Sequence, residues 1–120
     1  MSGPLTIDDV RAMVLALPGT EEVSWRGAPG FKAGGKFLCR LKEDGQTLGI
    51  RITFDEREML MEADPEAFYL TDHYRPYPAV LVRLSKVDPG TLKRLIVQHW
   101  RKVAPKKLVR AHDEAGANPS

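Results

Sequence analysis

Apolar residues recur at helical spacing near the start of the chain, from Val10 to Leu17. Thr6 stands before this run in the position of an N-terminal cap, and Asp9 takes the third helical position, as in a capping box. The Pro-Gly pair at residues 18–19 ends the pattern, because neither residue continues a helix well. The pattern therefore predicts a helix that begins just after Thr6.

Between residues 22 and 53 the period changes, and apolar residues alternate with polar ones as in half-buried strands. Gly34 and Gly35 separate two of these runs and supply the positive φ angles that a tight hairpin needs. Tight turns between neighbouring strands imply antiparallel pairing. The expected strands cover residues 22–25, 31–33, 36–41 and 47–53, and the first of them is short.

A second helix and at least one more strand follow. Asp55 is expected to begin the helix, with Glu58 three residues further on as its capping-box partner. Residues 68–70 form a short apolar segment, and a longer strand is expected at residues 79–84. In the irregular segment 72–78 two prolines keep the residues before them extended, so this segment leads the chain into the strand.

The last long helix has a strong start signal, because Asp88 can cap it and Pro89 can take its first position. Its apolar face holds Leu92, Leu95, Ile96, His99, Trp100 and Val103. Arg94 and Arg101 fall on the opposite face. The pattern therefore predicts a helix that is buried along one side and basic along the other.

The expected order of elements is α-β-β-β-α-β-β-α. Helices that are not interleaved with every strand indicate an α+β fold with an antiparallel sheet. Pro105 breaks the last long helix, and residues 106–112 could add one short helix. We expect a single domain over residues 1–112 and a disordered tail over residues 113–120.

The composition is that of a globular domain, since 42% of the 120 residues are hydrophobic and 28% are charged. No apolar run approaches the ~20 residues of a membrane helix. The N-terminus lacks the basic region of a secretory signal. Cys39 has no second cysteine with which to form an internal disulfide. We therefore expect a monomeric cytoplasmic protein, with no membrane partner and no cofactor.

Charge is spread unevenly, although the net charge is only +2. Residues 1–82 carry nine basic and 13 acidic side chains, whereas residues 83–112 carry nine basic side chains and one acid, Asp88. Such asymmetry is compatible with binding to nucleic acid or to an acidic partner. The simpler explanation is a C-terminal helix with a solvated basic face.

Strand alternation predicts which side chains of residues 36–41 face the helices. The side chains expected to face the helices are Phe37, Cys39 and Leu41, and those expected to face away are Lys36, Leu38 and Arg40. The same alternation gathers basic residues on the outer face of the sheet. They are Lys32, Lys36, Arg40, Arg51 and Arg83, interspersed with Leu38 and Leu81.

A basic sheet face suits phosphate contacts. Antiparallel sheets often carry one polar face without any ligand, and basic side chains there deter edge-to-edge pairing. The face also lacks paired exposed aromatic residues on which bases could stack, unless Trp25 or Tyr74 serves. The pattern thus permits a nucleic-acid interface without requiring one.

The reactive residues lack the spacing of a metal or catalytic site. His73, His99 and His112 lie far apart in the chain, without the intervals of zinc ligands. His99 is expected to be a hydrogen-bonded core residue, and His112 is expected to be solvated. Apolar surroundings should raise the pKa of the Cys39 thiol and so lower its reactivity. Asp72 and His73 point opposite ways on an extended chain, so we expect no catalytic residue and no metal site.

Several short motifs, taken in order, resemble the MmcQ/YjbR family of small bacterial proteins. They are WRGAPGF at residues 25–31, GKF at 35–37, HYRPYP at 73–78, VLVRL at 80–84, Trp100, and APKKL at 104–108. The resemblance runs across about residues 5–112. It implies an α+β fold of the kind described as double-winged or secretion-chaperone-like, in agreement with the order of elements above.

The family resemblance also carries a functional expectation. The family is commonly labelled DNA-binding, mainly through fold comparison, and has no established reaction or agreed catalytic residues. Two positions depart from the family pattern: Ala79 stands where a bulky aromatic residue often follows Tyr-Pro, and Pro76 stands where glycine is frequent. A binding surface that uses this aromatic residue in relatives would be weaker here.

Three functions remain open. The first is a DNA-binding module of weak sequence preference that contacts phosphates through Lys32, Lys36, Arg40, Arg51, Arg83, Arg94 and Arg101. The second is a chaperone-like adaptor that binds a protein partner through a sheet edge or a groove beside Trp25. The third is an enzyme or small-molecule binder with a pocket near Trp25, His73, Tyr74 and Tyr77.

Overall fold

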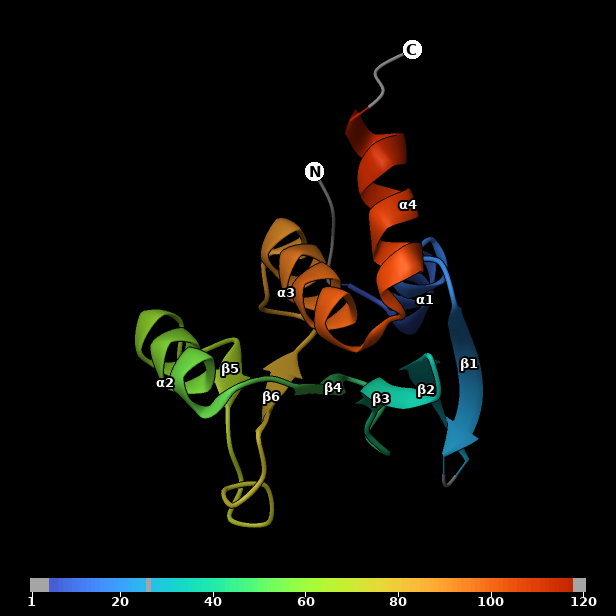
Figure 1. Ribbon diagram of the computed structural model, residues 1–120. Coiled ribbons are helices and arrows are strands. Elements are labelled where there is room, and N and C mark those ends of the chain that lie inside the picture. Colours follow the sequence, from blue (N-terminus) through green and yellow to red (C-terminus); the bar gives the residue numbers. More distant parts are fainter. Residues whose placement is uncertain (1–4, 26, 118–120) are drawn as a thin grey trace.

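A six-stranded antiparallel sheet carries the helices on one side (Figure 1), in a computed structural model that describes residues 5–25 and 27–117. The elements are α1 (Ile7–Leu15), β1 (Thr20–Trp25), β2 (Ala28–Ala33), β3 (Lys36–Leu41), β4 (Thr47–Arg51), α2 (Phe54–Ala63), β5 (Phe68–Tyr69), β6 (Ala79–Arg83), α3 (Pro89–Val103) and α4 (Lys106–Ala117). The strand order is β1-β2-β3-β4-β6-β5. The sheet therefore has one face against the helices and an open face on the other side.

The expected α+β architecture is confirmed, with one strand and one helix more than the expected order. The short run at residues 22–25 belongs to a six-residue edge strand, β1, so four strands precede α2. The short helix allowed after Pro105 is present as α4 and continues to Ala117. Residues 113–117, expected to be part of a disordered tail, belong to this helix, so the expectation was wrong for them. Residues 118–120 lie outside the described part of the chain.

Local capping signals account for the starts of the helices. Thr6 and Asp9 form the expected capping box, in which the Asp9 carboxylate accepts from the Thr6 backbone N–H at 2.8 Å. Asp88 caps α3 and accepts from the Thr91 N–H at 2.9 Å. The expected start of α2 at Asp55 was wrong by two residues, because the Thr53 hydroxyl accepts the Glu56 N–H at 3.1 Å and acts as the cap.

A β-bulge in β3 changes which residues face the helices. Phe31 pairs with Cys39, but the next residue, Lys32, pairs with Phe37, so Leu38 is the extra residue of β3. Leu38 is buried in the core on the helix side, although alternation had placed it on the open face. Phe37 moves to the open face, and the expectation that it would face the helices was wrong.

The same bulge removes Lys36 from the expected basic face. Lys36 pairs with Ala33, which is fully buried in the core on the helix side. Because directly paired residues project to the same side of a sheet, Lys36 lies on the helix side, at the end of the strand near Val103. Lys32 remains on the open face, where it pairs with Phe37.

The segment between β5 and β6 folds into consecutive turns instead of the expected extended lead-in. The Tyr74 N–H donates to the Thr71 carbonyl at 3.0 Å, and the Tyr77 N–H donates to the Tyr74 carbonyl at 3.0 Å. Residues preceding proline avoid the helical region, but hydrogen-bonded turns still bring the chain back on itself here. In Figure 1 this loop hangs below the sheet, on the side away from α1 and α3.

Trp100 joins the C-terminal half of the protein to the N-terminal half. Its side chain is fully buried, and its indole Nε1 donates to the Pro18 carbonyl at 2.9 Å. His112 of α4 packs edge-on against the indole, with ring centroids 5.0 Å apart. His112 is therefore half-buried, and the expectation that it would be solvated was wrong because α4 folds back onto α3.

Replacing Trp100 should reveal how much this junction contributes to stability. Trp100→Phe keeps a large ring but leaves the Pro18 carbonyl without its donor, so we expect a loss of about 1–3 kcal/mol in the free energy of unfolding. Trp100→Ala should cost about 3–5 kcal/mol, because it also opens a cavity. Urea unfolding followed by circular dichroism measures both losses.

Met59→Ala provides a control for the Trp100 variants, because this apolar side chain is 69% exposed on α2. We expect its effect to stay within about 0.5 kcal/mol. A Trp100→Phe protein as stable as the wild type would show that the indole hydrogen bond contributes nothing.

Candidate nucleic-acid interface

Arg51, the last residue of β4, lines three neighbouring hollows in the described part of the chain. The first has a volume of about 190 Å³, and we call it the aromatic groove. It is lined by Phe37, Arg51, Tyr74, Tyr77, Pro78 and Ala79. The second, the strand-end hollow, has a volume of about 450 Å³ and is lined by Lys36, Phe37, Arg51 and Val103. The two share Phe37 and Arg51, so they form one depression around the end of β4.

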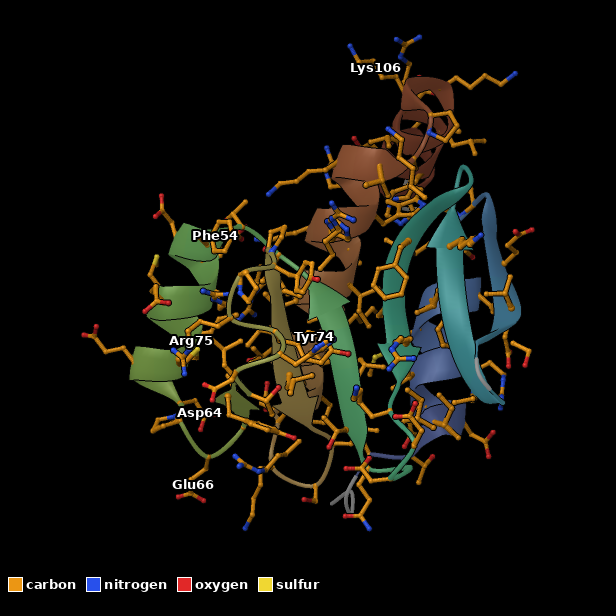
Figure 2. All side chains as sticks on the ribbon, turned by 90° about the horizontal axis from the view of Figure 1, so that it is seen from below. Phe54, Asp64, Glu66, Tyr74, Arg75 and Lys106 are labelled. Carbon is orange, nitrogen blue, oxygen red and sulfur yellow. The ribbon has the colours of Figure 1, made fainter. Side chains whose placement is uncertain are left out.

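Three separate parts of the chain build the aromatic groove. The bulge in β3 brings Phe37 to the open face, and the turns before β6 bring Tyr74 and Tyr77 over it. Tyr77 is 53% exposed, whereas Tyr74 is half-buried. Figure 2 looks onto the open face and shows Tyr74 lying over the middle of the sheet.

Buried Arg57 holds this loop in place from α2. Its side chain is buried, and its Nη1 donates to the carbonyl of Tyr77 at 2.7 Å and to that of Arg75 at 3.2 Å. A longer contact of 3.4 Å reaches the Ala79 carbonyl. One guanidinium thus fixes the backbone on both sides of Pro76 and Pro78, and with it the position of the Tyr77 ring.

Lys42 holds the Tyr74 hydroxyl, and Arg40 lies close by. Lys42 Nζ donates to the hydroxyl at 2.9 Å and lies 4.7 Å from the ring centroid. Burial raises the pKa of Tyr74, but the hydrogen bonds and charges of Lys42 and Arg40 outweigh burial and leave this pKa below its ordinary value. Tyr74 is therefore an anchored wall of the aromatic groove.

The seven basic residues expected from the sequence fall into two groups, and the first is engaged inside the protein. Arg40 is largely buried beside Tyr74, and its Nη2 lies 3.8 Å from a Glu43 carboxylate oxygen, whereas its Nη1 has no hydrogen-bond partner among the described residues. Arg83 donates to the Glu66 carbonyl at 2.7 Å and stacks over the Tyr69 ring, 4.0 Å from its centroid. Arg101 forms an ion pair with Asp113 of α4.

The second group consists of Lys32, Lys36, Arg51 and Arg94. Within residues 5–25 and 27–117 these four make no ion pair and no side-chain hydrogen bond. Lys36 and Arg51 line the strand-end hollow, and Lys32 lies across from Phe37 on the open face. Arg94 is exposed on α3, on the opposite side of the sheet. The structure therefore brings Lys36 and Arg51 together, and it places Lys32 on the neighbouring strand β2, opposite Phe37. Arg94 and Arg101 lie apart from this group, on α3.

His99 lies in the third hollow, a space of about 10 Å³ that Arg51, Glu56 and Lys102 also line. Burial lowers the pKa of His99 and outweighs a hydrogen bond with the Phe37 backbone, which raises it. The imidazole is therefore neutral at pH 7. The expected hydrogen-bonded core histidine is half-buried, and its Nε2 has no hydrogen-bond partner among the described residues.

The small-molecule pocket considered near Trp25 is not assembled as one site. His73 is exposed and packs against Tyr74 and Tyr77, with ring centroids 5.1 and 5.9 Å away. In the described part of the chain no ion pair joins His73 to an acid. Trp25 is the last residue of β1, and three strands, β2, β3 and β4, lie between β1 and β6 in the sheet. The side chain of Trp25 lies outside what the structure describes.

The other candidates for reactive chemistry are inert or absent from the described residues. Burial raises the pKa of the Cys39 thiol to about 12, so the thiol stays protonated at pH 7, as its strand position predicted. Among residues 5–25 and 27–117, no group of three or more His, Cys, Asp and Glu side chains is placed to hold a metal ion. None of the helices in this part of the chain is long and apolar enough to cross a membrane.

Sequence reasoning missed Phe37 as a residue of the site, and it considered Tyr77 only for a small-molecule pocket and not for the nucleic-acid interface. The bulge that exposes Phe37 depends on how β3 pairs with β2, and no residue in β3 signals it. Tyr77 had a visible signal, because a tyrosine between two prolines cannot sit in a regular helix or in a central strand. Interpreting this segment as the tip of a loop would have predicted that the ring of Tyr77 is exposed.

A family model described as YjbR matches residues 15–102 of the chain. This chain belongs to the YjbR family. Among its relatives are two proteins described as uncharacterised, Mb2600 of Mycobacterium bovis and Rv2570 of Mycobacterium tuberculosis. Each is 34% identical over 121 residues, covering 88% of this chain and 94% of the relative. The family expected from the short motifs is therefore confirmed.

A solved structure supports the fold of this YjbR protein. The crystal structure of Deinococcus radiodurans protein DR2400, whose family-model domain is described as DUF419, superposes with a TM-score of 0.65. The match covers 76% of this chain and 72% of that chain, at 23% sequence identity. At this identity the likeness establishes the α+β fold alone.

The anchoring of Tyr74 can be tested by spectrophotometric titration of the tyrosines. In the wild type we expect one tyrosine to ionise below the ordinary pKa of about 10, because Lys42 and Arg40 stabilise its phenolate. Lys42→Met removes the closest cation while burial remains, so this ionisation should move to higher pH.

Absorbance at the tyrosinate band between pH 8 and 12 follows the change, and Tyr74→Phe identifies the step by removing it. An unchanged titration in Lys42→Met would contradict the anchoring role of Lys42.

Proposed function

We propose that this YjbR protein is a non-enzymatic nucleic-acid-binding module that contacts phosphates around the end of β4. Arg51 carries the proposal, because it is exposed where the aromatic groove meets the strand-end hollow and has no ion-pair partner among the described residues. Lys36 lines the same depression, and Lys32 extends the basic surface along the open face. The DNA-binding label of the family agrees with this proposal.

The local charge balance favours an anionic ligand. Glu56 is the acid next to Arg51, and it is paired with Lys102 at 3.3 Å, so that its charge is largely offset. Lys42 and Arg40 lie beside Tyr74 with one acid, Glu43, at 3.9 and 3.8 Å from them, so that this group keeps a net positive charge. Contacts from Lys and Arg to the nucleic-acid backbone carry no sequence information, so we propose weak sequence preference.

This proposal narrows the basic set expected from the sequence. Lys32, Lys36 and Arg51 are assigned to phosphate contact, whereas Arg40 supports Tyr74 from within the fold. Arg83, Arg94 and Arg101 are left out, because Arg83 is bound to the loop before β5 and the other two lie on the helix side of the sheet.

The adaptor function has one structural observation in its favour. β1 is an edge strand of six residues, and such an edge could accept a strand from a protein partner. Glu21 and Glu22 place two charges on this edge, a feature that commonly discourages strand addition. A pull-down after nuclease treatment that recovered one protein at stoichiometric amounts would favour the adaptor.

Salt dependence tests the proposed phosphate contacts directly. We expect binding to a labelled DNA duplex at ~50 mM salt, with a log–log slope that steepens by about 0.9 for each phosphate contacted. Arg51→Glu should weaken binding and flatten the slope by about one contact. Fluorescence anisotropy at several salt concentrations measures both quantities.

Arg94→Glu is the matched control, because it makes the same change of charge at an exposed arginine on the other side of the sheet. It should change affinity much less than Arg51→Glu. Absence of binding to both the duplex and its single strands at ~50 mM salt would refute the proposal, and equal losses in the two variants would assign binding to net charge alone.

A further inference from the structure

We propose that the aromatic groove binds an unpaired nucleobase, so that the preferred partner of this protein is single-stranded nucleic acid. The inference rests on the proposed function and names the form of its ligand. It predicts that base stacking adds to the phosphate contacts of Arg51 and Lys36.

The groove brings three aromatic rings together from separate parts of the chain. Phe37, Tyr74 and Tyr77 come from the bulge and from the loop before β6, and all three line the same hollow. Tyr77 is 53% exposed, so its ring is accessible to a ligand in the groove. Every base presents a π-face, so rings in a basic groove bind single strands with little sequence preference.

The charges around the groove suit a base that is joined to phosphates. Arg51 lies in the groove itself, and Lys36 lies in the adjoining strand-end hollow. None of the described residues that line these two hollows is acidic. A strand with its base on the rings would place its backbone along Arg51 and Lys36, and the adjoining hollow gives that backbone room to continue.

The groove alone has about 190 Å³, less than the volume of about 300–1,000 Å³ of sites that enclose a small molecule, and it shares Phe37 and Arg51 with the strand-end hollow of about 450 Å³. A ring in the groove can therefore belong to a longer ligand that continues into this hollow. In a duplex the faces of the bases are stacked on one another, so a duplex could offer the groove only its edges and backbone. The groove therefore matches a base that has left the stack.

The rings are held in position before any ligand arrives. Arg57 fixes the backbone at Arg75 and Tyr77, and Lys42 fixes the hydroxyl of Tyr74. A preorganised surface loses little conformational entropy on binding. The anchored Tyr74 ring and the fixed backbone at Tyr77, beside an unengaged arginine, thus form a surface ready for stacking.

The test compares a labelled 12-nucleotide oligo(dT) with the duplex that it forms with oligo(dA), by fluorescence anisotropy at one salt concentration. We expect the single strand to bind at least about fivefold more tightly than the duplex. Tyr77→Ala should weaken single-strand binding at least about fivefold and leave duplex binding unchanged. Tyr77→Phe keeps the ring and should bind the single strand like the wild type.

Met59→Ala is a control for loss of an exposed apolar side chain outside the groove, and circular dichroism checks that each variant is folded. Equal affinity for single strand and duplex, or equal losses for both in Tyr77→Ala, would overturn the inference and leave the proposed function standing. Absence of binding to either form would refute both. Thymidine monophosphate that binds as tightly as the 12-mer would also overturn it, because the occupant would then be a free nucleotide.

Discussion

The Arg57 guanidinium is the contact on which the geometry of the open face depends. It reaches from α2 to the carbonyls of Arg75, Tyr77 and Ala79, so one buried group sets the turn, the exposed ring and the start of β6. A buried cation is costly unless its donors are satisfied and a counter-charge lies near. Glu58 supplies a counter-charge 3.6 Å from Nε, which has no hydrogen-bond partner among the described residues, and the Phe54 ring centroid lies 4.8 Å from the guanidinium. The placement of α2 beside β6 and the shape of the aromatic groove are thus consequences of one contact.

Features encoded by neighbouring residues could be predicted from the sequence. The caps at Thr6 and Asp88, the glycine hairpin and the antiparallel order all depend on local preferences, and the structure has them. Features that depend on a second strand could not be predicted. The bulge at Leu38 reflects how β3 packs between β2 and the core, and it reversed the expected faces of Phe37 and Lys36.

Charge counting has a similar limit at the candidate site. The sequence shows how many arginines could reach a ligand, but not which of them the fold already uses. Arg40 is largely buried beside Tyr74 and near the Glu43 carboxylate. Arg83 stacks over the Tyr69 ring and donates to the Glu66 carbonyl. What remains is a small set of cations beside aromatic rings, a combination that the alternation of strand residues alone did not predict.

The bulge makes the number of residues in β3 matter as much as their identities. Deleting Lys36 would restore regular alternation from Phe31 to the hairpin, because Leu38 would then pair with Lys32 and Phe37 with Ala33, and these two side chains would exchange faces. A YjbR relative with a one-residue gap at this position could keep the phenylalanine and still lack its ring in the groove. Alignment gaps in this strand, more than substitutions, would therefore separate family members with different open faces.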